Sequence, residues 1–192
     1  KTEFKPHPHI PLPTDLYPDR RNATGINLSD TTALTELQSA LQDAWAEPWQ
    51  AVPFFIGTSW RRRDVDIVDP CDHQRNVGTV TLADNAAAEQ ALSSATNAAP
   101  AWDATPAHQR AEILNKTADL LETHGPELMA LCVREGGKSL ADAVAEVREA
   151  VDFCRYYAVQ VRQHFGPGQV LNGPTGEYNA LQHHGRGVFA CL

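Results

Sequence analysis

The segment REGGKSLADAVAEVREAVDFCRYYAVQV, residues 134–161, contains the clearest helical pattern in the 192-residue chain. Its apolar residues recur at alternating steps of four and three, which places them on one face of a helix at 100° per residue. Ser139 precedes the pattern and Asp142 follows three residues later, as in an N-terminal cap. We therefore expect one continuous helix over residues 139–163, with a buried stripe formed by Leu140, Val144, Val147, Val151, Cys154, Ala158 and Val161.

A second face of this helix lies opposite the stripe. Glu149, Phe153 and Tyr156 follow the spacing i, i+4, i+7, so a carboxylate and two aromatic rings share it. A helix with a buried stripe and a mixed polar and aromatic face is expected to be packed on both sides.

The string EGGKS includes Gly137-Lys138-Ser139, which could end a phosphate-binding loop. That loop requires glycine where this sequence has Cys132, and the residues before it have the pattern of a helix where the loop needs a strand. A phosphate site of this type is therefore not expected.

Composition indicates a soluble, folded chain and excludes some functions. The net charge is −8, and the longest basic run, Arg61–Arg63, is followed at once by acidic residues, so we expect no nucleic-acid contact through this segment. No segment approaches the ~18 apolar residues of a membrane span, and no signal peptide opens the chain, so we expect a cytoplasmic protein. Its four cysteines lack a CxxC pair, which favours reduced thiols over zinc.

The N-terminal residues 1–26 form a proline-rich arm. Prolines at positions 6, 8, 11, 13 and 18 exclude a regular helix, so we expect an extended segment that lies over a surface or joins two domains. His7 and His9 in such an arm are interpreted as solvated, and no metal site is expected. Ser29-Asp30-Thr31 then caps an amphipathic helix that ends at Glu47-Pro48 and carries Leu34, Leu37, Leu41 and Trp45.

Residues 51–82 read as a meander of short strands. The predicted strands cover residues 54–56, 64–68 and 76–82, with a turn at Asp69-Pro70.

Residues 84–134 read as a run of helices. The first, over 85–99, is rich in alanine and is followed by Trp102 in a connecting segment. Pro106 opens the next helix, whose buried face we predict to be Ile113, Leu114, Ala118 and Leu121. Another helix covers 127–134. His108 and His124 are expected on the surface.

The C-terminal part begins with a link rich in glycine and proline. Two strands are then predicted within residues 178–192, joined by a turn at residues 185–187. His183 and His184 are adjacent in a strand and cannot both face one metal. The chain starts without methionine and ends in the apolar run 187–192, a raw strand edge that natural proteins avoid. We therefore expect a piece of a longer polypeptide, or its ordered part.

Several motifs together resemble the aldehyde dehydrogenase superfamily. Glu135, Gly137-Lys138, Glu146, Asp152-Phe153 and Tyr156-Tyr157-Ala158 occur in that family's order, and Trp60 and Asp69-Pro70 resemble its N-terminal strands. The resemblance implies an α/β fold, here the N-terminal part of an aldehyde dehydrogenase: a short strand meander, a helical bundle and the start of a Rossmann-like sheet. Residues 1–50 would be the proline-rich arm plus one helix, and residues 51–192 the N-terminal portion of the NAD-binding domain.

The N-terminal arm restricts the resemblance to one branch of this superfamily. HPHIPLPTDLYPDRRNATGINLSD, residues 7–30, looks like the segment that joins the two catalytic domains of the bifunctional proline utilization A flavoproteins, and EVREAVDFCRYYA, residues 146–158, looks like their semialdehyde dehydrogenase branch. This implies a parent that oxidises L-glutamate γ-semialdehyde, the hydrolysed form of 1-pyrroline-5-carboxylate, to glutamate with NAD. It also implies FAD in the proline dehydrogenase domain, and a homo-oligomer.

The chemistry of the resembling family requires a cysteine thiolate, an oxyanion hole and a glutamate base. Their positions in the family follow Leu192, so we assign no catalytic or cofactor-binding residue to this chain. Cys154 and Cys191 fall in apolar patterns and are expected to be buried, inert thiols.

The resemblance places one substrate-contacting glutamate at Glu149, near the amino group of the substrate. Beside Phe153 and Tyr156, this carboxylate could pair with an ammonium in a partly dry site. The alternative is a solvated helix carboxylate near Arg148 or Arg155. Two functions stay open: the N-terminal part of an NAD-dependent semialdehyde dehydrogenase, and a non-catalytic helical interaction or scaffold module.

Overall fold

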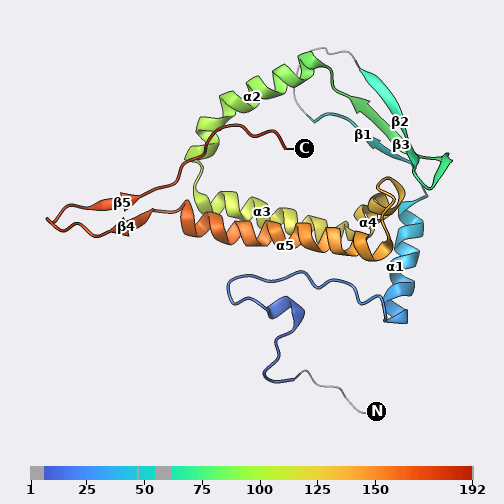
Figure 1. Ribbon diagram of the computed structural model, residues 1–192, viewed down its shortest axis with the longest axis horizontal. Coiled ribbons are helices and arrows are strands. Elements are labelled where there is room, and N and C mark those ends of the chain that lie inside the picture. The colour runs from blue at the N-terminus through green and yellow to red at the C-terminus, as the bar shows by residue number, and fades with distance from the viewer. Residues whose placement is uncertain (1–6, 47, 55–61, 192) are drawn as a thin grey trace.

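A long helix, α5, runs through the middle of the protein (Figure 1). The structure is a computed structural model that describes residues 7–46, 48–54 and 62–191. Helix α5 spans Leu140–His164, and Ser139 caps it by accepting the backbone N–H of Asp142 at 3.2 Å. Both features confirm the prediction. Of the predicted stripe, Val144, Val147, Val151 and Ala158 are buried, and Leu140, Cys154 and Val161 are partly buried.

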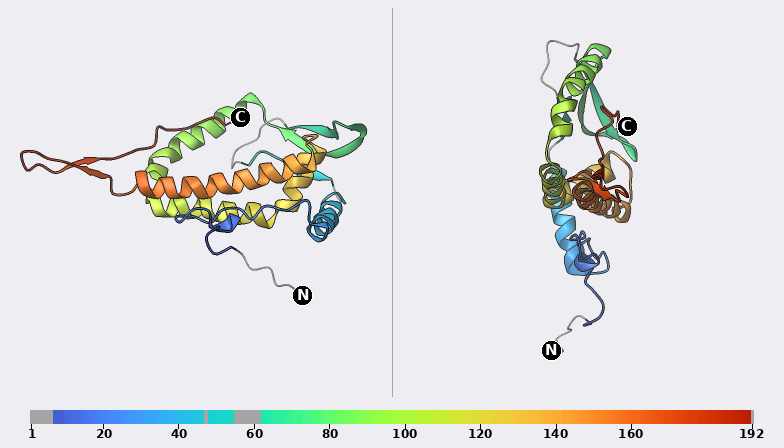
Figure 2. Two further views of the ribbon diagram at one scale, coloured as in Figure 1. Left: turned by 60° about the horizontal axis from the view of Figure 1, so that its bottom comes forward. Right: turned by 90° about the vertical axis from the view of Figure 1, so that its left-hand side faces the viewer.

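Helix α3 (Ala107–Thr123) packs antiparallel along α5 (Figures 1 and 2). Ala111 and Ala118 are fully buried, and side chains this small let the two helices approach closely. The predicted burial of Ile113 is wrong, because its side chain is 52% exposed. Ala111 and Ala118 define the buried face of α3, and Ile113 lies about 200° away from Ala111 around the helix.

Two shorter helices complete the core at one end of α5. Helix α4 (Gly125–Arg134) precedes it, and helix α1 (Thr31–Ala44) packs against α4. Asp30 caps α1 by accepting the backbone N–H groups of Thr32 and Ala33 at 2.9 and 3.4 Å, as predicted. The buried cluster at this end consists of Leu37, Leu41, Met129, Ala130, Ala143, Val144 and Val147.

Helix α2 (Asn85–Ala104) is longer than the sequence suggested. We predicted its end at residue 99 and placed Trp102 in a connecting segment, but the helix continues through Pro100 and includes Trp102. Proline removes the N–H that would bond to the Thr96 carbonyl. Because Thr96 and Pro100 are both exposed, water can hydrate that carbonyl, so the helix tolerates the proline.

A three-stranded sheet contains β1 (Trp49–Ala51), β2 (Arg63–Asp69) and β3 (Asp72–Leu82) in the order β1-β3-β2. The predicted meander is correct for β2 and β3, which are antiparallel, but β1 pairs with β3 in parallel and lies earlier than the predicted first strand. Residues 55–61, including Trp60, lie outside the described residues. Gly78 is required where β1 passes, since a Cβ there would stand 2.2 Å from the Trp49 carbonyl oxygen.

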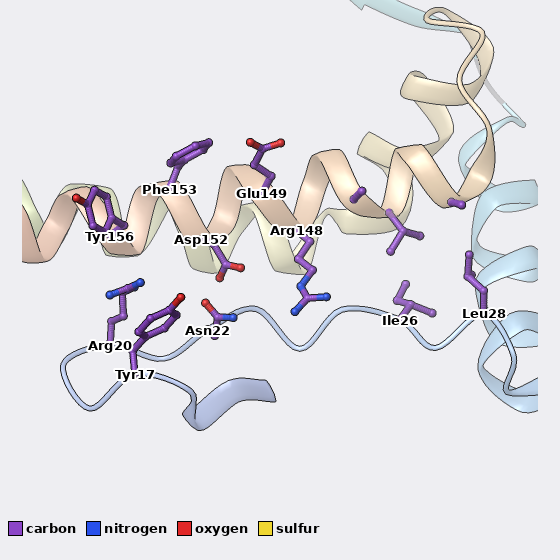
Figure 3. Close-up of a pocket in the computed structure, with 13 residues that line it drawn as sticks. Tyr17, Arg20, Asn22, Ile26, Leu28, Arg148, Glu149, Asp152, Phe153 and Tyr156 are labelled. Carbon is purple, nitrogen blue, oxygen red and sulfur yellow. The ribbon is translucent and has the colours of Figure 1, made fainter. Parts of the chain in front are cut away.

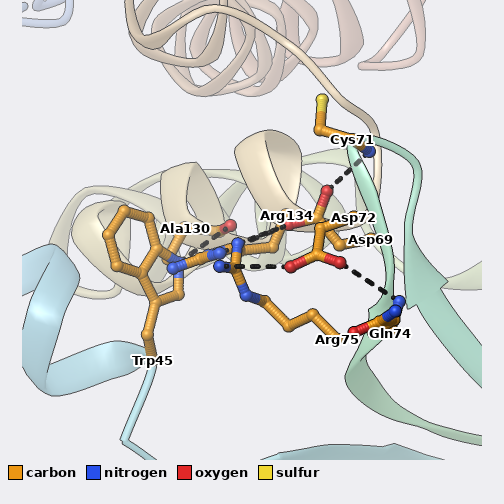
Figure 4. A network of polar contacts seen from close by, with 8 residues as sticks. All are labelled: Trp45, Asp69, Cys71, Asp72, Gln74, Arg75, Ala130 and Arg134. Atoms are coloured by element: carbon orange, nitrogen blue, oxygen red, sulfur yellow. Dashed lines mark hydrogen bonds and ion pairs between the residues drawn. The ribbon is translucent and has the colours of Figure 1, made fainter.

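A buried carboxylate joins this sheet to the helices (Figure 4). Asp69, at the end of β2, accepts from Arg75 of β3 at 3.1 Å, from Arg134 of α4 at 3.3 Å and from the backbone N–H of Cys71 at 2.8 Å. The Arg134 guanidinium stacks on the ring of Trp45, 4.2 Å from its centroid. The Asp69-Pro70 segment therefore connects the three-stranded sheet to the helices.

The C-terminal part projects as a hairpin and then returns along α2 (Figure 1). Strands β4 (Gln169–Leu171) and β5 (Asn179–Leu181) pair antiparallel, so β4 lies within the segment predicted to be a link. The strand predicted to follow the turn at 185–187 is not formed. Residues 182–191 have no regular structure, because no described strand runs alongside to hydrogen-bond with them.

The N-terminal arm lies against α5, as predicted for an extended segment. It contains one 3-10 turn (Pro13–Asp15), and residues 17–28 then follow α5 toward α1 (Figure 2). Within the described residues, we find no helix with the length and apolar character of a membrane span.

Candidate functional site

The arm and α5 enclose a groove that includes Glu149 (Figure 3). Its volume is about 750 Å³, within the range of small-molecule sites. The arm supplies Tyr17, Arg20, Asn22, Ile26 and Leu28, and successive turns of α5 supply Ala141, Val144, Ala145, Arg148, Glu149, Asp152, Phe153 and Tyr156.

Asp152 anchors the arm to the helix. Its carboxylate accepts the backbone N–H of Ala23 at 2.6 Å. The side-chain amide of Asn22, in the orientation that satisfies its surroundings, donates to both carboxylate oxygens at 3.0 and 3.3 Å. Ala23 is buried against Ala118 and Val151, so the arm belongs to the core at this point. The groove therefore has two walls that are fixed to each other.

Arg20 forms one end of the groove together with two tyrosines. Its guanidinium carbon lies 3.7 Å from the centroid of the Tyr17 ring and 5.3 Å from that of Tyr156. Cation–π contacts of this kind attract a guanidinium to the faces of aromatic rings. One nitrogen, Nη1, also donates to Asp19 at 3.2 Å.

Glu149 and Phe153 lie side by side one turn apart on α5, and both point away from the arm (Figure 3). Both side chains are exposed. Within the described residues, the Glu149 carboxylate has neither a hydrogen bond nor an ion pair, and a free carboxylate beside an aromatic ring can pair with an ammonium group.

The alternative interpretation of Glu149, a solvated helix carboxylate, placed Arg148 or Arg155 beside it. Arg155 is instead buried between α3 and α5, where it donates to Glu122 at 2.5 Å and to Asp119 at 3.2 Å. Burial alone would lower the pKa of Arg155, but these two carboxylates raise it above its ordinary value. Arg148 points toward the arm and packs against Gly25. The sequence pattern did not predict that Arg155 would be buried.

The thiols do not resemble a nucleophile. Burial raises the pKa of Cys154, and burial together with Glu146 raises that of Cys132, so little reactive thiolate forms at either. Cys154 is partly buried, but the expectation that Cys191 is buried is wrong: it is exposed at the end of the irregular segment.

The EGGKS string forms a helix-to-helix connection. Gly137 adopts a left-handed conformation with φ of 64°, and a Cβ there would stand 3.0 Å from Pro70. The Lys138 ammonium pairs with Glu146 on the first turns of α5, and this hydrogen bond raises the pKa of Lys138. Lys138, which lies in the connection before α5, is thus paired with a residue of that helix.

The histidines lie apart from this groove. His108 and His124 are exposed, as predicted. His184 contacts Asp103 of α2 at 3.3 Å, and Asp103 also accepts the backbone N–H of Gly185 at 2.6 Å. Among the described residues, no three His, Cys, Asp or Glu side chains gather as metal ligands would.

Comparison with known proteins identifies the family. Residues 57–192 match the sequence profile of the aldehyde dehydrogenase family. The chain belongs to this family. It is 45% identical over 161 residues to the bifunctional protein PutA of Klebsiella aerogenes, a match that covers 83% of this chain and 12% of that protein.

Solved structures of aldehyde dehydrogenase family members agree with this result. A Bradyrhizobium japonicum proline utilization A (PutA) D778Y mutant superposes with a TM-score of 0.71 at 38% identity, covering 94% of this chain and 15% of that chain. A Thermus 1-pyrroline-5-carboxylate dehydrogenase with bound NAD superposes with a TM-score of 0.69 at 31% identity, covering 80% and 30%. The chain therefore spans less than a third of each relative.

Sequence reasoning singled out Glu149, Phe153 and Tyr156, and the structure places all three along one groove. It missed Asp152 as the anchor of the arm and Arg20 as the cation between two rings. Arg20 and Asn22 carried a family resemblance, but only the fold brings them to α5, because Ala23 and Asp152 are 129 positions apart.

Proposed function

We propose that the chain is the N-terminal part of an NAD-dependent L-glutamate γ-semialdehyde dehydrogenase, which oxidises the semialdehyde to glutamate in proline catabolism. We further propose that the parent is a bifunctional enzyme with an FAD-dependent proline dehydrogenase domain and that it acts as a homo-oligomer. The observation that carries this proposal is the combined match of the arm and the helices to PutA, over 94% of the chain.

The arm supports the bifunctional parent in particular. The PutA structure aligns with 94% of the chain, whereas the Thermus 1-pyrroline-5-carboxylate dehydrogenase aligns with 80%. The arm is fixed to α5 by Asp152 and is therefore an integral part of this fold. We propose residues 1–50 as arm plus helix α1, and residues 51–192 as the first portion of the NAD-binding domain.

Glu149 is the residue through which we propose that this chain contacts substrate. The semialdehyde carries an ammonium group, which a carboxylate recognises by a charge-assisted hydrogen bond. Glu149 is free to do so because it has no partner among the described residues, and Phe153 beside it offers an aromatic face for a cation. Its role is to orient the substrate rather than to take part in the chemical step.

NAD does not fit the residues described here. A dinucleotide site requires a strand, a glycine-rich turn and a helix whose N-terminus faces the pyrophosphate. Among the described residues, a strand is followed directly by a helix only at β3 and α2, and the connection between them, Ala83-Asp84, contains no glycine. We therefore assign no part of the redox step, and no FAD contact, to the side chains of this segment.

The test uses the full-length polypeptide that contains this segment. Purified protein should reduce NAD when supplied with glutamate semialdehyde, and should turn over propanal far less efficiently. Failure to reduce NAD with the semialdehyde would favour the non-catalytic interaction module instead. Residues 1–192 alone should be inactive, and any NAD reduction by them would contradict the assignment of the chemistry to the rest of the polypeptide.

A further inference from the structure

The loop between β4 and β5 contains the one Asn-Gly pair of the sequence, Asn172-Gly173. Glycine is significant at this place because it has no Cβ to shield its backbone nitrogen. That nitrogen can reach the side-chain carbonyl carbon of the preceding asparagine and close a cyclic imide. The other asparagines all precede a residue with a side chain: Asn22, Asn27, Asn76, Asn85, Asn97, Asn115 and Asn179.

Both reacting groups of this pair are accessible in the structure. Asn172 is exposed, and its side-chain amide forms no hydrogen bond with the described residues. The backbone N–H of Gly173 likewise donates to no backbone acceptor in the described part of the chain. The hairpin projects away from the helices, so its loop is open to water (Figure 1).

Asn22 shows the opposite arrangement. It is buried, its side-chain amide donates to Asp152, and the backbone N–H of Ala23 donates to the same carboxylate at 2.6 Å. Both groups that would have to react at Asn22 are therefore held by hydrogen bonds. The contrast identifies Asn172 as the asparagine whose surroundings permit ring closure.

We propose that Asn172 is a site of spontaneous deamidation. The Gly173 nitrogen loses its proton to a base in the solvent and attacks the side-chain carbonyl carbon of Asn172. The new C–N bond displaces the side-chain nitrogen, which takes up a proton and leaves as ammonia, so that a cyclic imide remains. Water then opens the imide at either carbonyl group and leaves an aspartyl residue or its β-linked isomer. Water is the only co-reactant, so the reaction does not depend on the proposed dehydrogenase activity.

Deamidation would alter the hairpin where its two sides are in close contact. Asn172 directly follows the last pair of the β4–β5 ladder, Leu171 with Asn179. A Cβ at Gly173 would stand 1.9 Å from the Glu177 carbonyl oxygen and 3.3 Å from the Glu177 carboxyl carbon. Both products add a negative charge beside Glu177, and the β-linked isomer also lengthens the backbone by a methylene group. Like charges facing each other across a hairpin destabilise it, so we expect this end of the ladder to loosen.

The experiment follows the full-length polypeptide during long incubation in buffer made with heavy-oxygen water. Peptides covering residues 169–181 are then analysed by mass spectrometry after digestion in acid. Asn172 should exchange its amide for an acid that carries heavy oxygen, and faster at mildly alkaline than at neutral pH, because the attacking nitrogen must lose a proton. Asn179, in the same peptide but followed by alanine, should stay intact. A synthetic peptide of residues 169–177 is the positive control, and conversion of this peptide but not of the folded protein would overturn the proposal.

Two variants locate the reaction and its effect on the hairpin. Glutamine must close a larger ring, which forms more slowly, so Asn172→Gln should abolish the uptake of heavy oxygen. Asn179→Gln is the matched control and should leave the uptake unchanged. Hydrogen exchange of residues 169–181 should be faster in incubated wild type than in incubated Asn172→Gln. Equal uptake in wild type and Asn172→Gln would exclude Asn172 as the reacting residue, and equal exchange in the two would contradict the effect on the ladder.

Discussion

The carboxylate of Asp152 holds the backbone N–H of Ala23 at 2.6 Å, and so joins the N-terminal arm to the helix that carries Glu149. The contact lies beside buried Val151 and Ala118, where water has little access. A hydrogen bond from a main-chain donor to a charged acceptor in such a place is among the stronger ones in proteins. The arm is thereby held along the middle of α5.

Asp152→Ala should release the arm. The backbone N–H of Ala23 and the Asn22 amide would lose their acceptor, and we expect the free energy of unfolding of the full-length protein to fall by about 1–3 kcal/mol. Trypsin should also cleave faster after Arg21, which is exposed on the arm. Glu146→Ala, which removes only an exposed pair with Lys138, is the control and should leave stability nearly unchanged. Equal cleavage rates in the two variants would show that Asp152 does not hold the arm.

Arg155 gives a second stability prediction. It joins α5 to Glu122 and Asp119 of α3 while itself nearly buried. Arg155→Ala should destabilise the protein by about 1–3 kcal/mol, discounted because the Asp119 side chain is 64% exposed. Arg155→Met retains the packing of the aliphatic stem and should cost less. Chemical denaturation of the two variants tests this order, and the reverse order would show that packing is not the main contribution.

The sequence predicted most of the helices and one face of the groove. The period of α5 and the Asp30 cap of α1 are local features, so composition and spacing were sufficient for them. The parallel pairing of β1 with β3 depends on contacts between segments far apart in sequence, and a period of two cannot reveal it. The partners of Arg155 and Asp152 were missed for the same reason.

The errors in the helices have a different origin. Pro100 usually ends a helix, yet its exposed position lets α2 continue to Ala104. Ile113 is more apolar than Ala111, but the close approach of α3 to α5 selects the smaller side chain for the interface. In both cases the surroundings in the folded protein outweigh the preference of the residue type: solvent exposure at Pro100, and close packing of α3 on α5 at Ile113.

Acid should release the irregular C-terminal segment from α2. The backbone N–H of Gly185, and then His184, hold the pKa of Asp103 below its usual 3.8. Because the pKa of Asp103 is lower in the folded protein than in the unfolded chain, its ionised carboxylate stabilises the contact. This stabilisation is fully present above the unfolded pKa of 3.8, and it is lost as the pH falls further, through the folded-state pKa. Hydrogen exchange of residues 182–191, corrected for the intrinsic rate, should therefore accelerate as the pH falls below 3.8.

Asp103→Asn provides the control for this acid response. The variant cannot change charge in this range, so its segment should exchange at a rate that does not vary with pH after correction. Acceleration of the same size in the wild type and in Asp103→Asn would show that another group controls the segment.

The proposed substrate contact is tested by Glu149→Gln in the full-length enzyme. The amide keeps the shape of the side chain but loses the charge, so the fold and the melting temperature should not change. If the carboxylate pairs with the substrate ammonium, binding of glutamate semialdehyde should weaken by about 1.5–3 kcal/mol, as for a lost charge-assisted hydrogen bond. Steady-state kinetics with NAD should show this as a rise in KM.

A second aldehyde separates recognition from support of the fold. An aldehyde of similar length without the amino group has nothing for Glu149 to pair with, so its kcat/KM should be the same in Glu149→Gln and in the wild type. Glu146→Gln, one turn earlier on α5, should affect neither aldehyde. A solvated Glu149 would likewise leave both aldehydes unaffected, whereas a structural Glu149 would impair both together with the melting temperature. Only a loss confined to the amino aldehyde fits an ion pair with substrate, because the charge of Glu149 then acts on the one group that distinguishes the two molecules.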